Sequence, residues 1–450
     1  MIKERISDAF SGINSALIDN SDGDAKNRRY RLLYTWLATA ITTIVTGSYL
    51  TGLMLEMGAE DHYISTVSAL TALMGGAQLI APMIFERLTV RKNLLITLRL
   101  VYHLLNVLVI GIIPILPINK PLMLTLFMAV IVLLNLINSI STPGISIWQM
   151  QCVPPVKQSN YFTVSNLGAQ LISTASGLIA GGVVDSFKSG MFSTSGVSAT
   201  MFGFLVLRAA ALIFAIGEIF CMMKMDEREY GTDTEPRLKS IGALLEPLRN
   251  KSFVKIMTIY IFYNFVSGIV GQYFSVYLLT IANVSYSFLS YSNLLSMPFV
   301  FIATPIWNRL TNKYSWSKIL PMVIFGAGVA YVFNMFITAQ TQYFHFIVMI
   351  LFNIFYPSIL IIYAYLPYVN MPKHNRTSYI SLFTTSGLVF SFLGTLFGML
   401  FMTLTEGIGI NLFGWNMINY QYINLLQFVL FALLAVYAHF VCKDYEKNKV

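Results

Sequence analysis

Two short basic stretches, Glu86-Arg87-Leu88-Thr89-Val90-Arg91-Lys92 and Asn308-Arg309-Leu310-Thr311-Asn312-Lys313, echo each other in the two halves of the chain. Each stretch lies between two long apolar runs, after the second such run of its half. Internal repeats of this kind are common among polytopic membrane proteins. The sequence therefore predicts a duplicated unit of six membrane spans.

The composition supports a location in a membrane. Hydrophobic residues make up 56% of the 450 residues and charged residues 11%, whereas a soluble domain carries about 25% charged residues. Apolar runs of roughly 20 residues, long enough to cross a bilayer core of about 30 Å, recur along the chain. We expect an all-α polytopic membrane protein whose twelve transmembrane helices form two pseudo-symmetric six-helix bundles. The expected spans are 32–55, 63–85, 94–116, 121–150, 161–184, 199–223, 254–281, 286–306, 319–339, 343–369, 377–403 and 420–442.

The distribution of basic residues predicts the orientation. Of the 29 Lys and Arg residues, 25 lie in the two termini and in alternate loops, while the intervening loops hold only Lys120 and Lys188. By the positive-inside rule, both termini face the cytoplasm and the chain is a multi-pass protein of the cytoplasmic membrane. The net charge of +9 therefore reflects topology, and we expect the lipid bilayer rather than nucleic acid as its partner.

The spans also set the expected domain boundaries. Cys152, Cys221 and Cys442 fall near the cytoplasmic ends of spans, and an odd number of cysteines there argues against disulfides and a metal cluster. We expect no cofactor, and a monomer is a plausible state. The expected parts are a cytoplasmic tail (1–30), an N-terminal six-helix bundle (31–223), a cytoplasmic linker (224–252), a C-terminal six-helix bundle (253–442) and a C-terminal tail (443–450).

Polar side chains recur at helical spacing inside several spans. Lipid gives such side chains no partner, so they face either a neighbouring helix or a water-filled cavity. For Ser and Thr, helix packing is the stronger explanation. For Asn and Gln, which are costlier to bury, we favour the cavity. The predicted substrate-binding residues are Thr42, Thr46, Asn135, Asn138, Asn166, Gln170, Asn264, Gln272, Tyr273, Asn353 and Tyr356.

Charged residues inside the expected spans are few. Arg99 lies about five residues into its span, so we expect it to extend to the inner surface. Glu218 lies close to the cytoplasmic end of its span, and we expect it to reach water. Arg208 lies in the outer half of the same span, where a charge needs a partner or a wet cavity. A structural pair with Asp185 and a substrate-facing Arg208 are equally consistent with the sequence.

These basic turns and spans resemble the major facilitator superfamily over essentially the whole chain. That superfamily carries a basic signature between spans 2 and 3 and a weaker copy between spans 8 and 9. The segment from Trp148 to Phe162 is similar to a poorly characterised bacterial branch, which usually has Arg-Gly-Arg where this chain has Gln158-Ser159-Asn160. The resemblance implies two bundles that expose a central site alternately to the two sides. The gating residues that it implies are Glu86, Arg87, Arg91, Arg309 and Arg376.

The favoured function is secondary transport of a small organic solute. The polar stripes are poor in charge, which suits a neutral hydrogen-bonding solute such as a sugar or nucleoside. The sequence has no glycine-rich nucleotide loop followed by Lys-Ser or Lys-Thr, so we do not expect ATP to drive transport directly. Export of amphipathic compounds, such as a drug or peptide, is the close alternative. A polytopic membrane enzyme is less favoured, because the five His residues are scattered and the spans hold no paired carboxylates.

The energy source depends on the few titratable groups. We predict either facilitated diffusion or proton coupling through Glu56, with Glu218 in reserve and Arg208 and Asp185 as further coupling candidates. Like-charge repulsion from Glu60 and Asp61 is expected to raise the pKa of Glu56.

Overall fold

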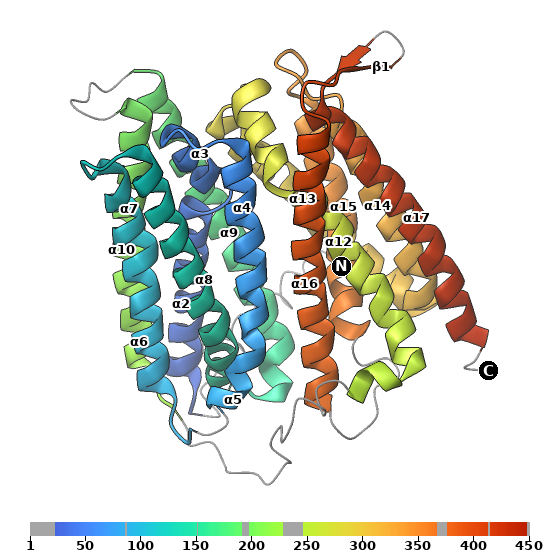
Figure 1. Cartoon of the computed structure of the whole chain (residues 1–450). Coiled ribbons are helices and arrows are strands. Elements are labelled where there is room, and N and C mark those ends of the chain that lie inside the picture. Colours follow the sequence, from blue (N-terminus) through green and yellow to red (C-terminus); the bar gives the residue numbers. More distant parts are fainter. Residues whose placement is uncertain are drawn as a thin grey trace, which may run out of the picture. The chain divides into compact units, whose positions relative to one another are not determined.

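A computed structural model describes residues 23–85, 88–150, 152–190, 198–227, 246–366, 376–412 and 415–447. Eleven helices in this part of the chain are long and apolar enough to cross a membrane. The remaining expected span, 63–85, falls on three shorter elements in series: α4 (Asp61–Gly75), η1 (Gly76–Ile80) and α5 (Ala81–Phe85). The prediction of an all-helical polytopic membrane protein is confirmed, and the helix order fits twelve spans (Figure 1).

The helices cluster into two compact units. In the first unit, α2 packs against α9 and α10, and α6 packs against α8 and α10. These helices run alongside one another in Figure 1, coloured from blue to green. The elements of the first unit, besides α5, are α2 (Ala25–Val45), α3 (Ser48–Glu56), α6 (Lys92–His103), η2 (Leu104–Val109), α7 (Ile110–Ile112), η3 (Ile113–Ile115), α8 (Lys120–Met150), α9 (Pro155–Lys188) and α10 (Ala199–Lys224).

Two of the expected spans in the first unit are not uniform α-helices. The span expected at 32–55 breaks between α2 and α3 at Gly47, whose φ of 59° is accessible to glycine but strained for most other residues. The span expected at 94–116 passes from α6 through the π-helix η2 before α7. A π-helical turn shifts the faces of the residues that follow it, and such turns are frequent at functional sites.

The second unit contains the helices of the second half together with α4. Whereas the sequence-based boundaries group α4 with the first half, its contacts are with α12 and α16. Strands β1 and β2 form an antiparallel hairpin in which Ile410 lies opposite Met417. The other elements are η4 (Glu246–Arg249), α12 (Lys251–Val276), η5 (Tyr277–Ile281), α13 (Tyr286–Tyr314), α14 (Trp316–Asn334), α15 (Phe344–Tyr365), α16 (Arg376–Leu404), β1 (Ile410–Leu412), β2 (Trp415–Met417) and α17 (Asn419–Lys447).

Helix α12 is broken at Gly271, whose φ of 32° and ψ of −121° are not helical. Such a break disturbs the helical hydrogen bonds to carbonyls about four residues earlier. Two side chains from other helices supply donors there: Thr395 Oγ1 donates to the Gly268 carbonyl (3.3 Å) and Gln427 Nε2 to the Val266 carbonyl (2.8 Å). Helices α16 and α17 therefore support the segment of α12 just before its break.

Candidate functional site

Neutral polar side chains are exposed within the membrane-spanning helices of the first unit. Thr42 of α2 and Asn166 and Gln170 of α9 are all exposed. Hydrocarbon offers such groups no hydrogen-bond partner, so polar side chains of spanning helices that remain exposed are expected to face water. These three residues are the part of the predicted substrate-binding set in the first unit whose side chains are exposed.

The rest of the polar face of α9 packs against α2 and α3. Thr43 Oγ1 lies 3.0 Å from Ser173 Oγ, and the Tyr49 hydroxyl donates to the Gly177 carbonyl at 2.8 Å. One face of α9 thus divides along its length into an exposed part, near Gln170, and a part used for helix packing. On α9, therefore, some polar residues pack against neighbouring helices and others remain exposed.

Several predicted site residues bond to their own helix. The Thr42 hydroxyl donates to the Ala38 carbonyl (2.8 Å), and the Thr46 hydroxyl donates to the Thr42 carbonyl (2.7 Å). Asn135 Nδ2 donates to the Ile131 carbonyl at 2.8 Å. A hydroxyl that donates to its own helix keeps its lone pairs as acceptors, so Thr42 can still accept a hydrogen bond from a solute.

A buried charge cluster lies behind this face. Arg99 Nε donates to Glu218 Oε1 at 2.6 Å, and Arg99 Nη1 donates to Asn138 Oδ1 at 3.1 Å. Arg99 is 8% exposed and Glu218 is 0% exposed. The Arg99 guanidinium also stacks over the Tyr102 ring, 4.7 Å from its centroid. The two opposite charges neutralise each other inside the unit.

Two more side chains complete this charge cluster. The Tyr34 ring, from α2, lies beside the Arg99 guanidinium, with Arg99 Cζ 5.9 Å from the ring centroid. His103 Nε2 lies 3.1 Å from Glu218 Oε2, although not at an angle that makes a hydrogen bond. Helices α2, α6, α8 and α10 therefore all contribute to one polar network. Nothing in the sequence marked Tyr34, since a Tyr in a span is usually a packing residue.

The sequence-based expectations for two of these charges were wrong. Arg99 does not extend to the inner surface and Glu218 does not reach water; each is buried against the other. The physical reason is the cost of an unpaired charge in a membrane, which a direct pair between neighbouring helices removes. Position along a helix was visible in the sequence, but the direction in which each side chain points was not.

Arg208 has a backbone partner that neither of the two sequence-based alternatives included. Its guanidinium donates to the backbone carbonyl of Asn106, in the π-helix η2, rather than pairing with Asp185. The aliphatic part of Arg208 packs beside Gly111, where an added Cβ would lie 3.4 Å from Arg208 Cδ, an ordinary contact distance. Arg208 is 4% exposed, which leaves little of it for a solute. Asn106 in turn donates to the Tyr102 hydroxyl at 3.3 Å, which links Arg208 to the charge cluster.

In the second unit, the predicted site residues differ in accessibility. Asn353 Nδ2 donates to Ser296 Oγ of α13 at 2.7 Å. Asn264 Nδ2 donates to the Tyr260 carbonyl at 2.8 Å. Tyr273 is buried, and the Gln272 side chain lies outside the described part of the structure.

Tyr356 is a predicted site residue of the second unit whose side chain is exposed. Its side chain is 46% exposed in the middle of α15. Seven residues further along α15, the Tyr363 ring packs against Tyr260 and Tyr263 of α12, at centroid distances of 5.2 Å and 4.9 Å. The Tyr260 ring stacks on Phe383 at a centroid distance of 4.1 Å. Tyr356 is therefore an exposed phenol on a helix that also contributes the buried Tyr363 to an aromatic group.

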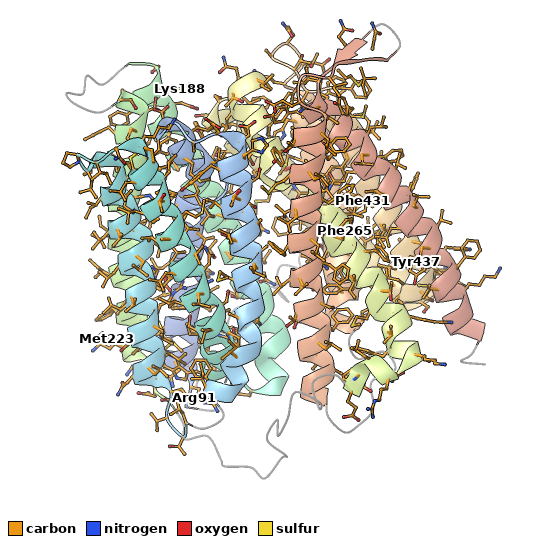
Figure 2. All side chains as sticks on the ribbon, viewed as in Figure 1. Arg91, Lys188, Met223, Phe265, Phe431 and Tyr437 are labelled. Carbon is orange, nitrogen blue, oxygen red and sulfur yellow. The ribbon has the colours of Figure 1, made fainter. Side chains whose placement is uncertain are left out.

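The predicted gating residues are only partly described. Arg91 lies just before α6, at the same end of the first unit as Met223 and at the opposite end from Lys188 (Figure 2). Arg309 is exposed near the end of α13. Arg376 opens α16, but its side chain lies outside the described part, as do Glu86 and Arg87 altogether.

The predicted coupling carboxylate Glu56 is exposed, and its Oε2 accepts a hydrogen bond from the Ser198 hydroxyl at 2.7 Å. At the start of α4, burial raises the pKa of Asp61, and the neighbouring charges of Glu406 and Glu60 raise it further while His62 lowers it. Among the described residues, no three His, Cys, Asp or Glu side chains are grouped closely enough to hold a metal ion.

Comparisons with known proteins agree with this architecture. A family model described as Major Facilitator Superfamily matches residues 31–395. A mutant form of the nucleoside transporter NupG superposes with a TM-score of 0.67 at 11% identity, covering 92% of this chain and 99% of that one. A D-xylose–proton symporter gives a TM-score of 0.64 at 10% identity, covering 91% and 96%. A bacterial homologue of the iron transporter ferroportin gives 0.66 at 12% identity, covering 93% and 98%. No curated protein sequence matches the chain.

Proposed function

Because the chain belongs to the major facilitator superfamily, we propose that it moves a small, uncharged organic solute across the cytoplasmic membrane by alternating access. The fold makes it a secondary transporter rather than an enzyme. In the proposed orientation both termini face the cytoplasm. In alternating access the substrate site opens in turn to the two sides of the membrane.

The observation that carries the choice of an uncharged solute is the chemistry of the exposed polar residues in the spans. Thr42, Asn166, Gln170 and Tyr356 offer hydroxyl and amide groups and no charge. The buried Arg99 and Glu218 neutralise each other, and so neither is left to pair with a charged solute. A site with such groups favours a solute that both donates and accepts hydrogen bonds, such as a sugar or a nucleoside.

One observation supports a second candidate, export of amphipathic compounds. Helix α15, which carries the exposed Tyr356, packs its Tyr363 ring against Tyr260 and Tyr263, and aromatic walls suit apolar rings. The two candidates differ in what the exposed amides do. A sugar or nucleoside needs Asn166 and Gln170 as hydrogen-bond partners, whereas an amphipathic compound depends mainly on the aromatic wall.

For the energy source, we propose facilitated diffusion or proton coupling through an acidic side chain. Glu56 is accessible to water and can exchange a proton directly. Glu218 can exchange one only if its pair with Arg99 opens, so it remains the reserve candidate. Transport under an imposed pH gradient, in the parent and in Glu56→Gln and Glu218→Gln, separates the possibilities. Facilitated diffusion predicts no accumulation in any of the three.

The experiment that tests the substrate proposal is counterflow into proteoliposomes containing the purified protein. A panel should include xylose, uridine, an anionic sugar phosphate and the amphipathic dye rhodamine 6G. We expect saturable exchange of a neutral sugar or nucleoside, reduced by Gln170→Leu. Exchange of the dye alone, unaffected by Gln170→Leu, would favour the exporter. Exchange of the sugar phosphate alone would contradict an uncharged substrate.

A further inference from the structure

Residues at the beginning of α6 form hydrogen bonds with the three-residue segment that follows α10. Both Glu227 carboxylate oxygens accept hydrogen bonds from backbone N–H groups: Oε1 from Arg91 at 2.7 Å and Oε2 from Lys92 at 2.9 Å. These N–H groups lie at the beginning of α6, where helical amides have no partner in their own helix and the helix dipole is positive. A carboxylate in this position is a charge-assisted cap.

A second pair of hydrogen bonds joins the same two helix ends, and here a side chain of α6 donates to α10. Lys92 Nζ donates to the carbonyls of Met223 (2.9 Å) and Met225 (2.5 Å), at the end of α10. Carbonyls at the end of a helix lack partners, and the helix dipole is negative there, so an ammonium group satisfies them. Thus α6 and α10 cap each other: a residue after α10 caps the beginning of α6, and a residue of α6 caps the end of α10.

Two more helices are tied to the same three residues. The Trp148 indole N–H, from α8, donates to the Asp226 carbonyl at 3.3 Å. The Asp226 backbone N–H donates to Asn27 Oδ1, from α2, at 3.1 Å. We name Met225, Asp226 and Glu227 the clip, because they connect the ends of α2, α6, α8 and α10.

The clip and the buried Arg99–Glu218 pair both join α6 to α10, at two positions along the helices. Lys92 and Arg99 are seven residues apart on α6, and Met225 and Glu218 are seven residues apart at the end of α10. Seven residues are about two helical turns, so Lys92 and Arg99 lie on one face of α6 about 10 Å apart, and Glu218 lies about two turns before the end of α10. Two polar contacts at different positions along α6 and α10 oppose both sliding of one helix along the other and separation of their ends.

We propose that the clip, through Glu227 and Lys92, is the positioning device that holds this end of the first unit closed as one rigid body. The clip directly follows α10, whose end it joins to the ends of α2, α6 and α8. A displacement of the end of α10 therefore reaches four helices together rather than α10 alone. Glu227 and Lys92 act through helix ends, so this role does not depend on the identity of the solute.

The native cysteines allow a direct test. Cys221 is 4% exposed, one turn before the end of α10, and packs in a buried cluster with Trp148 and Met225. Cys442, on α17 in the second unit, is 2% exposed and serves as an internal control. Labelling of a buried thiol reports how often the structure around it opens. The full-length protein in lipid nanodiscs is treated with N-ethylmaleimide, and each cysteine is followed by mass spectrometry.

Losing the charge-assisted caps is expected to raise the labelling rate of Cys221 about tenfold or more in Glu227→Gln and in Lys92→Gln, with Cys442 unchanged. Asp226→Asn is the matched control: it removes the same charge from the neighbouring position, but the clip uses only the Asp226 backbone. Glu227→Asp should restore part of the protection. Unchanged Cys221 labelling, an equal rise in Asp226→Asn, or a rise that includes Cys442 would each overturn the proposal.

Discussion

Replacing Glu218 by Gln should destabilise the first unit strongly. Gln keeps the size of the side chain but removes the charge that faces Arg99 Nε at 2.6 Å. Arg99 then stays buried with no compensating charge, and breaking a buried pair in this way costs about 3–5 kcal/mol. Since a native protein is stable by only about 5–15 kcal/mol, this is a large fraction of the total.

The size of this effect can be measured by thermal unfolding of the detergent-solubilised protein. For a unit of about 150–250 residues each kcal/mol lowers Tm by about 2–4 °C, so Glu218→Gln is expected to lower it by about 6–20 °C. A thiol-reactive dye that reports exposure of the buried cysteines is a suitable assay. Glu56→Gln, which changes an exposed carboxylate, is the control and should leave Tm within about 2 °C.

The double variant Arg99→Met, Glu218→Leu makes the test specific. Replacing both members of a buried pair by apolar residues of similar volume is often neutral or stabilising, because neither charge is left unpaired. We expect its Tm to lie well above that of Glu218→Gln and close to that of the parent. A Glu218→Gln variant as stable as the parent, or a double variant as unstable as the single one, would refute the reasoning.

Three further predictions concern the exposed residues and the strained backbone. Tyr356→Phe removes one hydrogen bond and should weaken binding of the transported solute by roughly tenfold or less. Tyr356→Ala also removes the ring and should weaken binding further. The shift of Tm with solute concentration measures the affinity of both variants. Gly271→Ala places a Cβ at a φ of 32°, which costs about 1–3 kcal/mol and should lower Tm without lowering expression of the protein in the membrane. Asp61→Asn should raise Tm at neutral pH: the folded-state pKa of Asp61 is raised, so folding favours its protonated form and stability falls as pH rises through that pKa. The gain from Asn should vanish when the pH is lowered below the pKa of unfolded Asp, where the parent is protonated too, and a gain that is independent of pH would contradict this assignment.

The sequence contained enough information for the spans but not for their contacts. Apolar runs of bilayer length are visible in one dimension, so α8, α13 and α17 were expected close to their observed places. The break at Gly47 and the π-helix η2 were not expected, because a glycine or an apolar run is equally compatible with a continuous helix.

The site was predictable only where a single helix decides the outcome. Gln170 and Tyr356 were identified from polar positions in apolar spans, and both are exposed. The pair between Arg99 and Glu218 joins residues 119 positions apart, and one sequence does not reveal which helices are neighbours. Glu227 was overlooked for the same reason: a single acidic residue after a span gives no sign that it caps a helix that begins 135 positions earlier.

The most direct test of alternating access around the exposed polar face is the accessibility of Gln170, in the middle of α9. A Gln170→Cys variant lacking the three native cysteines is reconstituted in vesicles of both orientations and treated with a membrane-impermeant maleimide. Alternating access predicts labelling from either side, with the solute identified by counterflow changing the two rates in opposite directions or protecting from both. Labelling only by a lipid-soluble reagent, or from one side alone under all conditions, would contradict the account.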